Sequence, residues 1–363
     1  MKVGIITFHK AINYGAVLQA YALSNVVRSM GYECELIDYI TESHEEEYKP
    51  KAKKKLRDYL VPQQNQERYD KFMEFIRHKL VLSSHKYYKA QDFKKHFPDC
   101  DVFIAGSDQI WNTRFVENKR VTDIYFLGMP EFKCKIAYAP SLGASEEKEL
   151  RKYEKFLQEF RFIFMREEAG RSLMARLLKR NDIQCALDPT FLLQPADWAK
   201  LSKRRYTGKP YMLFYAVNKD DSVIIAKKLA AKWKLKMIVI SYLDFYWGRN
   251  IINCMNAGPE EFLDLIRNAE LVCTTSFHAT AFSIIMERPF YCIEKNKHDA
   301  RKINILQKLA LADRVISAPE EVDRLKDYHL SYTKARVILE QERARSLDLL
   351  RSALQYFQRE EAL

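Results

Sequence analysis

Residues 2–39, KVGIITFHKAINYGAVLQAYALSNVVRSMGYECELIDY, contain the pattern that decides the fold. Residues 3–8 form a short apolar run typical of a buried strand, and residues 34–39 form a second one. Between them, residues 16–30 repeat apolar side chains at helical spacing, and Gly31 provides a C-terminal stop. A strand, a helix and a strand in this order predict a βαβ unit with parallel strands.

The same alternation continues along the chain. Further strands are expected at 101–105, 134–139, 162–165, 211–217, 236–241 and 271–274, and further helices at 146–160, 220–233, 260–268, after Ser276 and at 332–357. A Gly-Lys-Pro break at 208–210 precedes a restart of the pattern, and 363 residues exceed the usual size of one domain. We therefore expect domains at 1–205 and 206–330, followed by a helical segment, 331–363, that packs back on the first domain.

The excess of positive charge needs either an anionic partner or another explanation. The chain has 60 Lys+Arg and 48 Asp+Glu, a formal net charge of +12. A basic run from Lys49 to Arg57 lies in a surface insertion expected at 41–60, where it would suit an anionic membrane surface or serve solubility alone. The run has little aromatic interleaving and no nucleic-acid-binding module is recognisable, so nucleic acid is not the expected partner.

The cysteines and the N-terminus indicate a reducing compartment. Seven cysteines without a CxxC pair argue against a disulfide framework or a structural zinc site, and neither a metal nor a cofactor is predicted. The N-terminus resembles a strand more than a signal peptide, and no apolar run approaches the ~20 residues of a transmembrane helix. We expect a cytoplasmic protein, with peripheral contact at the inner face of the membrane as an option that the basic run leaves open.

Ligands of a doubly wound sheet bind outside the carboxyl ends of its strands. After the first strand, HKAINYG offers His9, Asn13 as a helix cap, and Gly15 for close approach of a ligand. The segment lacks both the GxGxxG and the GxxxxGK[ST] patterns, so neither a dinucleotide nor a P-loop site is indicated. A strand-to-helix turn without a ligand explains it equally well.

Two further strand ends carry polar side chains. In AGSDQIWN, Ser107 and Asp108 offer a hydroxyl and a carboxylate, and Trp111 could stack on a sugar. The alternative is a helix cap followed by a core tryptophan. Arg166 follows the strand at 162–165, where it could bind phosphate or carboxylate in a bidentate manner or pair with a neighbouring glutamate.

The most informative segment is 273–283, CTTSFHATAFS. A strand ends in consecutive hydroxyl residues and a helix begins, so we expect His278 and the Thr280 amide to face a cleft between the domains. A lone histidine is more often structural. Its position after a strand and among hydroxyls favours a functional role here.

Together these segments resemble the polysaccharide pyruvyl transferase family. The carrying motifs are GIIT with NYGAVLQA, GSDQIWN, Arg166-Glu167, Asp188-Pro189-Thr190 and Ser276-Phe277-His278-Ala279-Thr280, in family order from residue 1 to about residue 315. The resemblance implies two Rossmann-like α/β domains in a glycosyltransferase-B-like arrangement with an inter-domain cleft. It also implies transfer of a pyruvyl group from phosphoenolpyruvate to two hydroxyls of a sugar, polymeric or lipid-linked, with formation of a cyclic ketal and release of phosphate.

Within that resemblance we expect His278 to act as general acid. Distant family members carry an arginine where this chain has Ser276, so other groups must anchor the donor. Donor binding is assigned to Arg166, Ser276 and Thr280 and to Arg301 or Arg314, and the acceptor or cleft residues are His9, Asn13, Gly15, Ser107, Asp108 and Trp111.

Two other functions stay open. A nucleotide-sugar glycosyltransferase can have the same fold, because fold does not fix function. A non-catalytic sugar-binding protein would use Trp111, Trp198 and Trp247 as stacking platforms. The leaving group, phosphate or nucleoside diphosphate, distinguishes the two enzymes.

Overall fold

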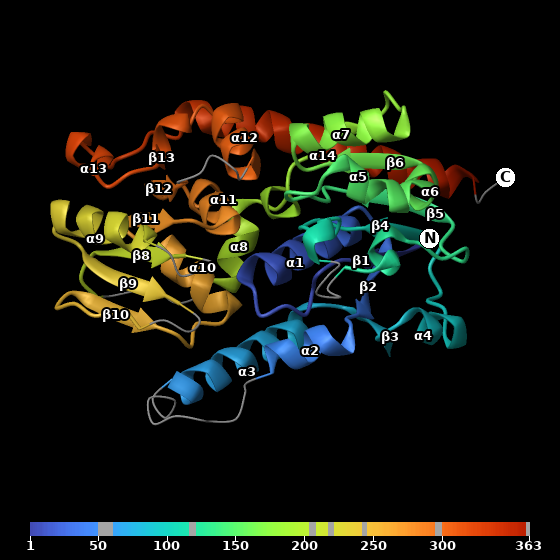
Figure 1. The fold of residues 1–363 in the computed structure, drawn as a ribbon, viewed down its shortest axis with the longest axis horizontal. Helices are drawn as coiled ribbons and strands as arrows, with labels where there is room; N and C mark the ends of the chain where they lie inside the picture. The colour runs from blue at the N-terminus through green and yellow to red at the C-terminus, as the bar shows by residue number, and fades with distance from the viewer. Residues whose placement is uncertain are drawn as a thin grey trace. The chain divides into compact units, whose positions relative to one another are not determined.

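Two parallel β-sheets organise the chain, one in each of two units (Figure 1). The computed structural model describes residues 1–49, 61–115, 121–202, 208–216, 221–241, 245–294 and 300–360. Unit 1 comprises Met1–Lys49, Ile76–Leu193 and Glu340–Leu363, and unit 2 comprises Pro50–Phe75 and Gln194–Leu339. Both contain the alternating strands and helices that the sequence predicts.

The sheet of unit 1 has seven strands in the order β3-β2-β1-β4-β5-β6-β7, and each neighbouring pair is parallel. Its strands are β1 (Lys2–Ile6), β2 (Glu33–Tyr39), β3 (Leu82–Tyr87), β4 (Val102–Ala105), β5 (Cys134–Tyr138), β6 (Phe162–Met165) and β7 (Gln184–Cys185). In the middle, Val3 of β1 pairs with Cys34 on one side and Val102 on the other. Because the strands are parallel, their carboxyl ends share one edge of the sheet.

Helices connect these strands. They are α1 (Tyr14–Ser29), α2 (Glu42–Tyr48), α4 (Ala90–Lys95), η2 (Thr113–Phe115), η3 (Asp123–Phe126), α5 (Glu147–Leu150), η4 (Arg151–Tyr153), α6 (Glu154–Gln158), α7 (Glu168–Leu178) and η5 (Pro189–Phe191). The side chain of Asn13 caps α1 by accepting a hydrogen bond from the Ala16 amide at 3.2 Å. The helix expected at 146–160 is divided into α5, η4 and α6.

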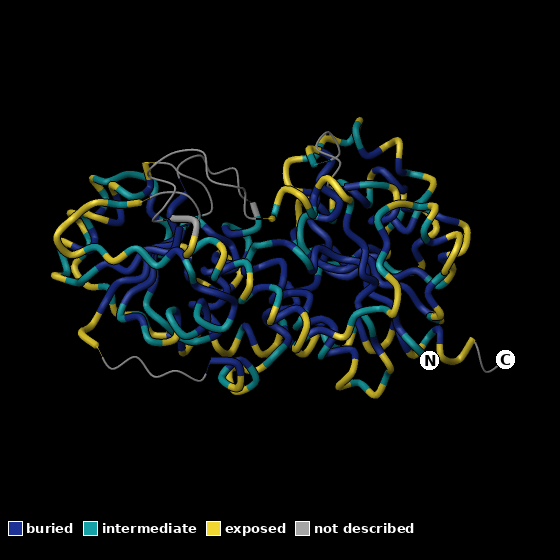
Figure 2. The backbone as a smooth tube through the Cα atoms, turned by 90° about the horizontal axis from the view of Figure 1, so that it is seen from below, coloured by how far each residue is buried: buried dark blue, intermediate teal, exposed yellow. Residues whose placement is uncertain are grey.

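The sheet of unit 2 has six parallel strands in the order β10-β9-β8-β11-β12-β13. Its strands are β8 (Tyr211–Tyr215), β9 (Lys236–Ile240), β10 (Ile251–Cys254), β11 (Leu271–Thr274), β12 (Phe290–Ile293) and β13 (Val315–Ile316). Its helices are α8 (Pro195–Leu201), α9 (Ser222–Lys232), α10 (Pro259–Arg267), α11 (Phe277–Ile285), α12 (Ala300–Lys308), η6 (Ala312–Arg314) and α13 (Glu321–Arg324). In both units the central strands are almost fully buried, whereas β3, β7 and β10 are partly exposed, and most exposed residues lie on helices and loops (Figure 2).

Two long helices contribute to both units, α3 (Val61–Lys79) and α14 (Thr333–Glu360). In unit 2, Arg68 of α3 donates to the carbonyls of Ser241 and Met255, each at 3.2 Å. In unit 1, Arg343 of α14 donates to the Phe191 carbonyl at 2.6 Å. The expected insertion at 41–60 therefore divides: α2 belongs to unit 1, whereas residues 50–60, with most of the basic run, lie outside the described residues.

The units change at Leu193/Gln194, earlier than the boundary expected near residue 205. The reason is α8, whose Trp198 packs edge-on against Phe282 of unit 2 at 4.8 Å between ring centroids. The Gly-Lys-Pro break ends a connection inside unit 2. Across the described stretches, the helices all lack the length and apolar content needed to cross a bilayer.

Candidate functional site

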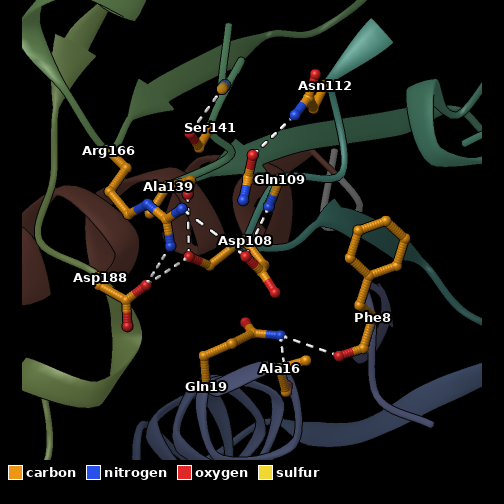
Figure 3. A network of polar contacts seen from close by, with 12 residues as sticks. Phe8, Ala16, Gln19, Asp108, Gln109, Asn112, Ala139, Ser141, Arg166 and Asp188 are labelled. Carbon is orange, nitrogen blue, oxygen red and sulfur yellow. Dashed lines mark hydrogen bonds and ion pairs between the residues drawn. The ribbon is translucent and has the colours of Figure 1, made fainter. Parts of the chain in front are cut away.

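In unit 1, polar side chains gather at the carboxyl ends of β4 and β6. The guanidinium of Arg166, just after β6, lies 2.8 Å from Asp188 through its Nη1 atom. It lies 3.8 Å from both Asp108 and Glu167. We call these four residues, together with Ser107, the Arg166 cluster. Figure 3 shows the side chains of Arg166, Asp188 and Asp108 close together. Three carboxylates surround one guanidinium, so its positive charge is compensated within the protein.

Asp188 is the residue that fixes this cluster. Its Oδ2 atom accepts from Arg166 and from the Ser107 hydroxyl at 3.0 Å, and its Oδ1 atom accepts from the amide and hydroxyl of Thr190 at 3.0 and 2.8 Å. Ser107 also donates to the Ala139 carbonyl at 3.0 Å. The structure thus supports the ion-pair interpretation of Arg166, with Asp188 as its close partner in place of the adjacent glutamate.

Asp108 has an unusual backbone. Its φ angle is +72°, a left-handed conformation that costs free energy for a residue with a side chain, although less for Asp and Asn than for most others. The segment after β5 holds it there: Asp108 forms an isolated parallel bridge with Pro140, and its carbonyl accepts from the Ser141 amide at 2.8 Å. The Gln109 amide donates to Oδ1 of its side chain at 2.8 Å.

The connection between β1 and α1 is tied to this region through Gln19. Its amide nitrogen donates to the hydroxyl of Thr7 and to the carbonyl of Ala16 at 2.9 Å, and to the carbonyl of Phe8 at 3.3 Å. Thr7 donates in turn to the Ser107 carbonyl at 2.9 Å. A side chain on Gly106 would meet Thr7 at 2.9 Å, so glycine permits this close approach. Gly15, expected to admit a ligand, lies in the buried first turn of α1.

His9 forms a separate group with Asp38 and Lys10. Its ring nitrogens lie 3.1 Å from the Thr7 carbonyl and 3.2 Å from Asp38, and Lys10 contacts the other carboxylate oxygen at 2.7 Å. Burial opposes ionisation of Asp38, but the hydrogen bonds and charges of His9 and Lys10 outweigh it and lower the pKa of this carboxyl. His9 is therefore engaged with its own loop, through the Thr7 carbonyl, and with β2, through Asp38.

The expectation that Trp111 stacks on a sugar is wrong. The side chain is fully buried, its indole donates to the Tyr125 carbonyl at 3.0 Å, and its ring stacks on Phe126. The core alternative is the correct one. Trp198 is also fully buried, so of the tryptophans offered as platforms only Trp247, 80% exposed, is accessible.

In unit 2, His278 lies in the first turn of α11, directly after β11. Ser276 caps the helix by accepting from the Ala279 amide at 3.3 Å, and Thr280 donates back to the Ser276 carbonyl at 3.0 Å. Both hydroxyls thus shape the start of the helix that carries His278. The positive end of the helix dipole makes such a terminus favourable for an anion.

A buried lysine supports the same loop. Lys302 of α12 donates to the Thr275 carbonyl at 2.8 Å and pairs with Glu294, which follows β12, at 2.5 Å. Lys302 and Glu294 are functional candidates that sequence reasoning missed, as are Asp188 and Gln19. Asp188 and Gln19 lie within motifs that carried the resemblance, Asp188-Pro189-Thr190 and NYGAVLQA, whereas no sequence signal marked Lys302 or Glu294.

The two arginines offered for the donor differ in place. Arg301 of α12 lies 6.0 Å from the ring of Phe277, the neighbour of His278. The Nη atoms of Arg314 donate to the carbonyls of Tyr328 and His329 at 3.3 and 3.2 Å. The Tyr328 hydroxyl donates a hydrogen bond to Glu270, the residue just before β11. Arg314 is therefore connected to the amino end of β11, whereas His278 follows its carboxyl end. The geometry favours Arg301.

The parts of the chain that the structure describes contain no group of three or more His, Cys, Asp or Glu placed to hold a metal ion. All seven cysteines lie in these parts and are free thiols. Burial raises the pKa of the Cys34 thiol to about 12, which makes it a poor nucleophile at neutral pH.

Comparison with solved structures shows the fold. UDP-GlcNAc 2-epimerase from Methanocaldococcus jannaschii, in complex with UDP-GlcNAc and UDP, is 12% identical with a TM-score of 0.55, covering 94% of this chain and 99% of that one. UDP-N-acetylglucosamine 2-epimerase from Rickettsia bellii is 11% identical with a TM-score of 0.53, and the match covers 99% of this chain and 98% of that one. AviGT4, a glycosyltransferase involved in avilamycin A biosynthesis, is 11% identical with a TM-score of 0.50, and the match covers 100% of this chain and 98% of that one. The expected fold class, two parallel α/β sheets of the GT-B-like kind, is confirmed.

Sequence comparison identifies the family. A search of curated proteins found no match. The family model described as polysaccharide pyruvyl transferase matches residues 13–296, which include the Arg166 cluster and His278. The chain therefore belongs to the polysaccharide pyruvyl transferase family, an enzyme family.

Proposed function

We propose that this chain transfers a pyruvyl group from phosphoenolpyruvate to two hydroxyls of a sugar, forming a cyclic ketal and releasing phosphate. The observation that carries the proposal is the family match over residues 13–296, with His278 in the first turn of α11. The acceptor is a sugar in a polysaccharide or in a lipid-linked repeat unit.

The chemistry needs a proton donor and anion-binding groups. His278 gives a proton to the methylene carbon of the donor, and the first sugar hydroxyl attacks the adjacent carbon and loses its own proton. The oxygen of the second hydroxyl then bonds to that carbon while the bond from carbon to the phosphate oxygen breaks. Phosphate leaves with the electron pair of that bond and takes up the proton that the second hydroxyl loses. No cofactor is consumed.

Several groups are suited to the anionic donor. The helix N-terminus at Ser276 and Thr280 and the guanidinium of Arg301 favour negative charge near His278. Arg166 is left out of the proposed donor site because Asp108, Glu167 and Asp188 already compensate the charge of its guanidinium. Arg314 is left out because its Nη atoms are occupied by backbone carbonyls.

The test is incubation with phosphoenolpyruvate and a panel of galactosides, glucosides and N-acetylmannosamine derivatives, with phosphate release as the readout. Acceptor-dependent phosphate release and a ketal product are expected. Release of a nucleoside diphosphate from a nucleotide sugar would indicate a glycosyltransferase instead. Sugar binding without either release would indicate a binding protein.

Contact with a membrane belongs to the same proposal. A lipid-linked acceptor would be met at the inner face of the membrane, where the Lys49 to Arg57 run would bind anionic lipid. Salt-sensitive sedimentation with vesicles containing phosphatidylglycerol is expected. Equal sedimentation with neutral vesicles would leave solubility as the role of the run.

A further inference from the structure

Asp108 has a strained backbone and a carboxylate of which only one oxygen accepts a hydrogen bond from the described residues. Its left-handed φ of +72° would be relieved by glycine, yet an aspartate stands there, held by the bridge to Pro140. Strain of this kind at a polar residue commonly marks a functional position. Helix capping does not explain why an aspartate stands at this position, because the amide that donates a hydrogen bond to Asp108 is that of Gln109, the next residue in the same turn.

The two oxygens of Asp108 differ. Oδ1 accepts from the Gln109 amide at 2.8 Å and lies 3.8 Å from Arg166 Nη2. For Oδ2, the described residues supply no hydrogen-bond donor, and the side chain is 14% exposed. One oxygen is thus fixed in place while the other is available to a ligand.

A second acceptor lies nearby without a donor. Gln19 is fully buried, and its three bonds through Nε2 to oxygen acceptors fix the orientation of its amide. Among the described residues, its Oε1 atom has no hydrogen-bond partner. Thr7 links Gln19 to the carbonyl of Ser107, the residue before Asp108. Figure 3 shows the second carboxylate oxygen of Asp108 pointing toward the Gln19 amide.

Two acceptor oxygens without donors in this region are suited to a bound group that carries hydrogen-bond donors. A neutral sugar with neighbouring hydroxyls provides them, and a buried acceptor left without a donor is costly. The surrounding charge also favours a neutral ligand, because Asp108, Glu167 and Asp188 outnumber Arg166.

We propose that Asp108 Oδ2 and Gln19 Oε1 form the acceptor-sugar subsite of unit 1, and that Asp108 is the general base for the attacking hydroxyl. The hydroxyl oxygen forms its bond to the central carbon of the donor, its O–H bond breaks, and the proton passes to Oδ2. The carboxylate later returns that proton to solvent. This inference rests on the proposed function.

The test compares Asp108→Asn and Asp108→Gly with wild type. Asparagine keeps the shape and tolerates the left-handed backbone but cannot take the proton, so kcat should fall roughly 10²–10⁴-fold. KM for phosphoenolpyruvate should change less than about threefold, and the acidic limb of the pH–rate profile should disappear, which a structural role would not produce. Glycine removes the backbone strain, so the Asp108→Gly variant should have a melting temperature equal to or above that of wild type, while its activity is lost. Asp99→Asn, at an exposed aspartate in the same unit, is the charge-matched control.

Wild-type kcat in Asp108→Asn would overturn the assignment, as would a parallel loss of melting temperature and activity in both variants. If wild type releases no phosphate with any acceptor, the proposed function fails, and the subsite is then tested by binding alone. Methyl glycosides titrated in ligand-observed NMR should bind wild type and bind Asp108→Asn at least about tenfold more weakly. No binding to wild type, or equal binding to both proteins, would reject the subsite.

Discussion

The guanidinium of Arg166 and the carboxylate of Asp188 lie 2.8 Å apart, with side-chain exposures of 2% and 0%. A pair this buried is costly to break, because the remaining charge has neither water nor a partner of opposite sign. We expect Arg166→Met to lower the free energy of unfolding by roughly 3–5 kcal/mol in urea titrations. The exposed pair Arg336–Glu287 is the control, and Glu287→Gln should cost less than about 1 kcal/mol. If Arg166→Met lowered the free energy of unfolding as little as Glu287→Gln does, the structural role of the Arg166–Asp188 pair would be contradicted.

His278→Ala should abolish ketal formation and leave the melting temperature nearly unchanged. The imidazole sits in the first turn of a helix whose cap, Ser276, does not depend on it. Phosphate release with phosphoenolpyruvate and an active acceptor is the measurement. His329→Ala is the matched control, since that ring is 70% exposed in the same unit. Wild-type turnover in His278→Ala would remove the histidine from the mechanism.

Periodicity predicted the fold because strand and helix patterns are local. The run at 3–8 and the helix at 16–30 correspond to β1 and α1 within about two residues at each end. The helix at 146–160 was less well predicted, because a turn of 3₁₀-helix interrupts it. Such breaks depend on packing that a single segment does not encode.

The candidate site was predicted only in part, since its key contacts join distant segments. Ser107 and Asp188 are 81 positions apart, and no local pattern brings them together. Trp111 was misassigned because the local sequence around a tryptophan after a turn does not show whether the side chain faces the core or a ligand. Arg301 and Arg314 were equivalent in the sequence, and only their surroundings separate them.

Asp38 should make unit 1 sensitive to acid. His9 and Lys10 lower the pKa of the buried carboxyl below its unfolded value of about 3.9. The ionised form therefore stabilises the fold above that value, and its contribution is lost as pH falls through the lower folded pKa. Asp38→Asn should cost roughly 1–3 kcal/mol at pH 7. The difference in stability between the two proteins should shrink from about pH 4 downward in thermal unfolding series. A gap that stays constant to pH 2 would show that ionisation of Asp38 is not the cause.

Arg301→Ala and Arg314→Ala should separate binding from stability. Arg301 lies beside Phe277, next to His278, so its loss removes a charged donor from the proposed phosphoenolpyruvate site. A charge-assisted hydrogen bond contributes roughly 1.5–3 kcal/mol, so the donor Kd should rise about 10- to 150-fold in calorimetry. Arg314 bonds to the carbonyls of Tyr328 and His329, and its loss should lower the melting temperature while the donor Kd stays within about twofold. The reverse pattern, with weaker donor binding only in Arg314→Ala, would transfer the donor role to Arg314.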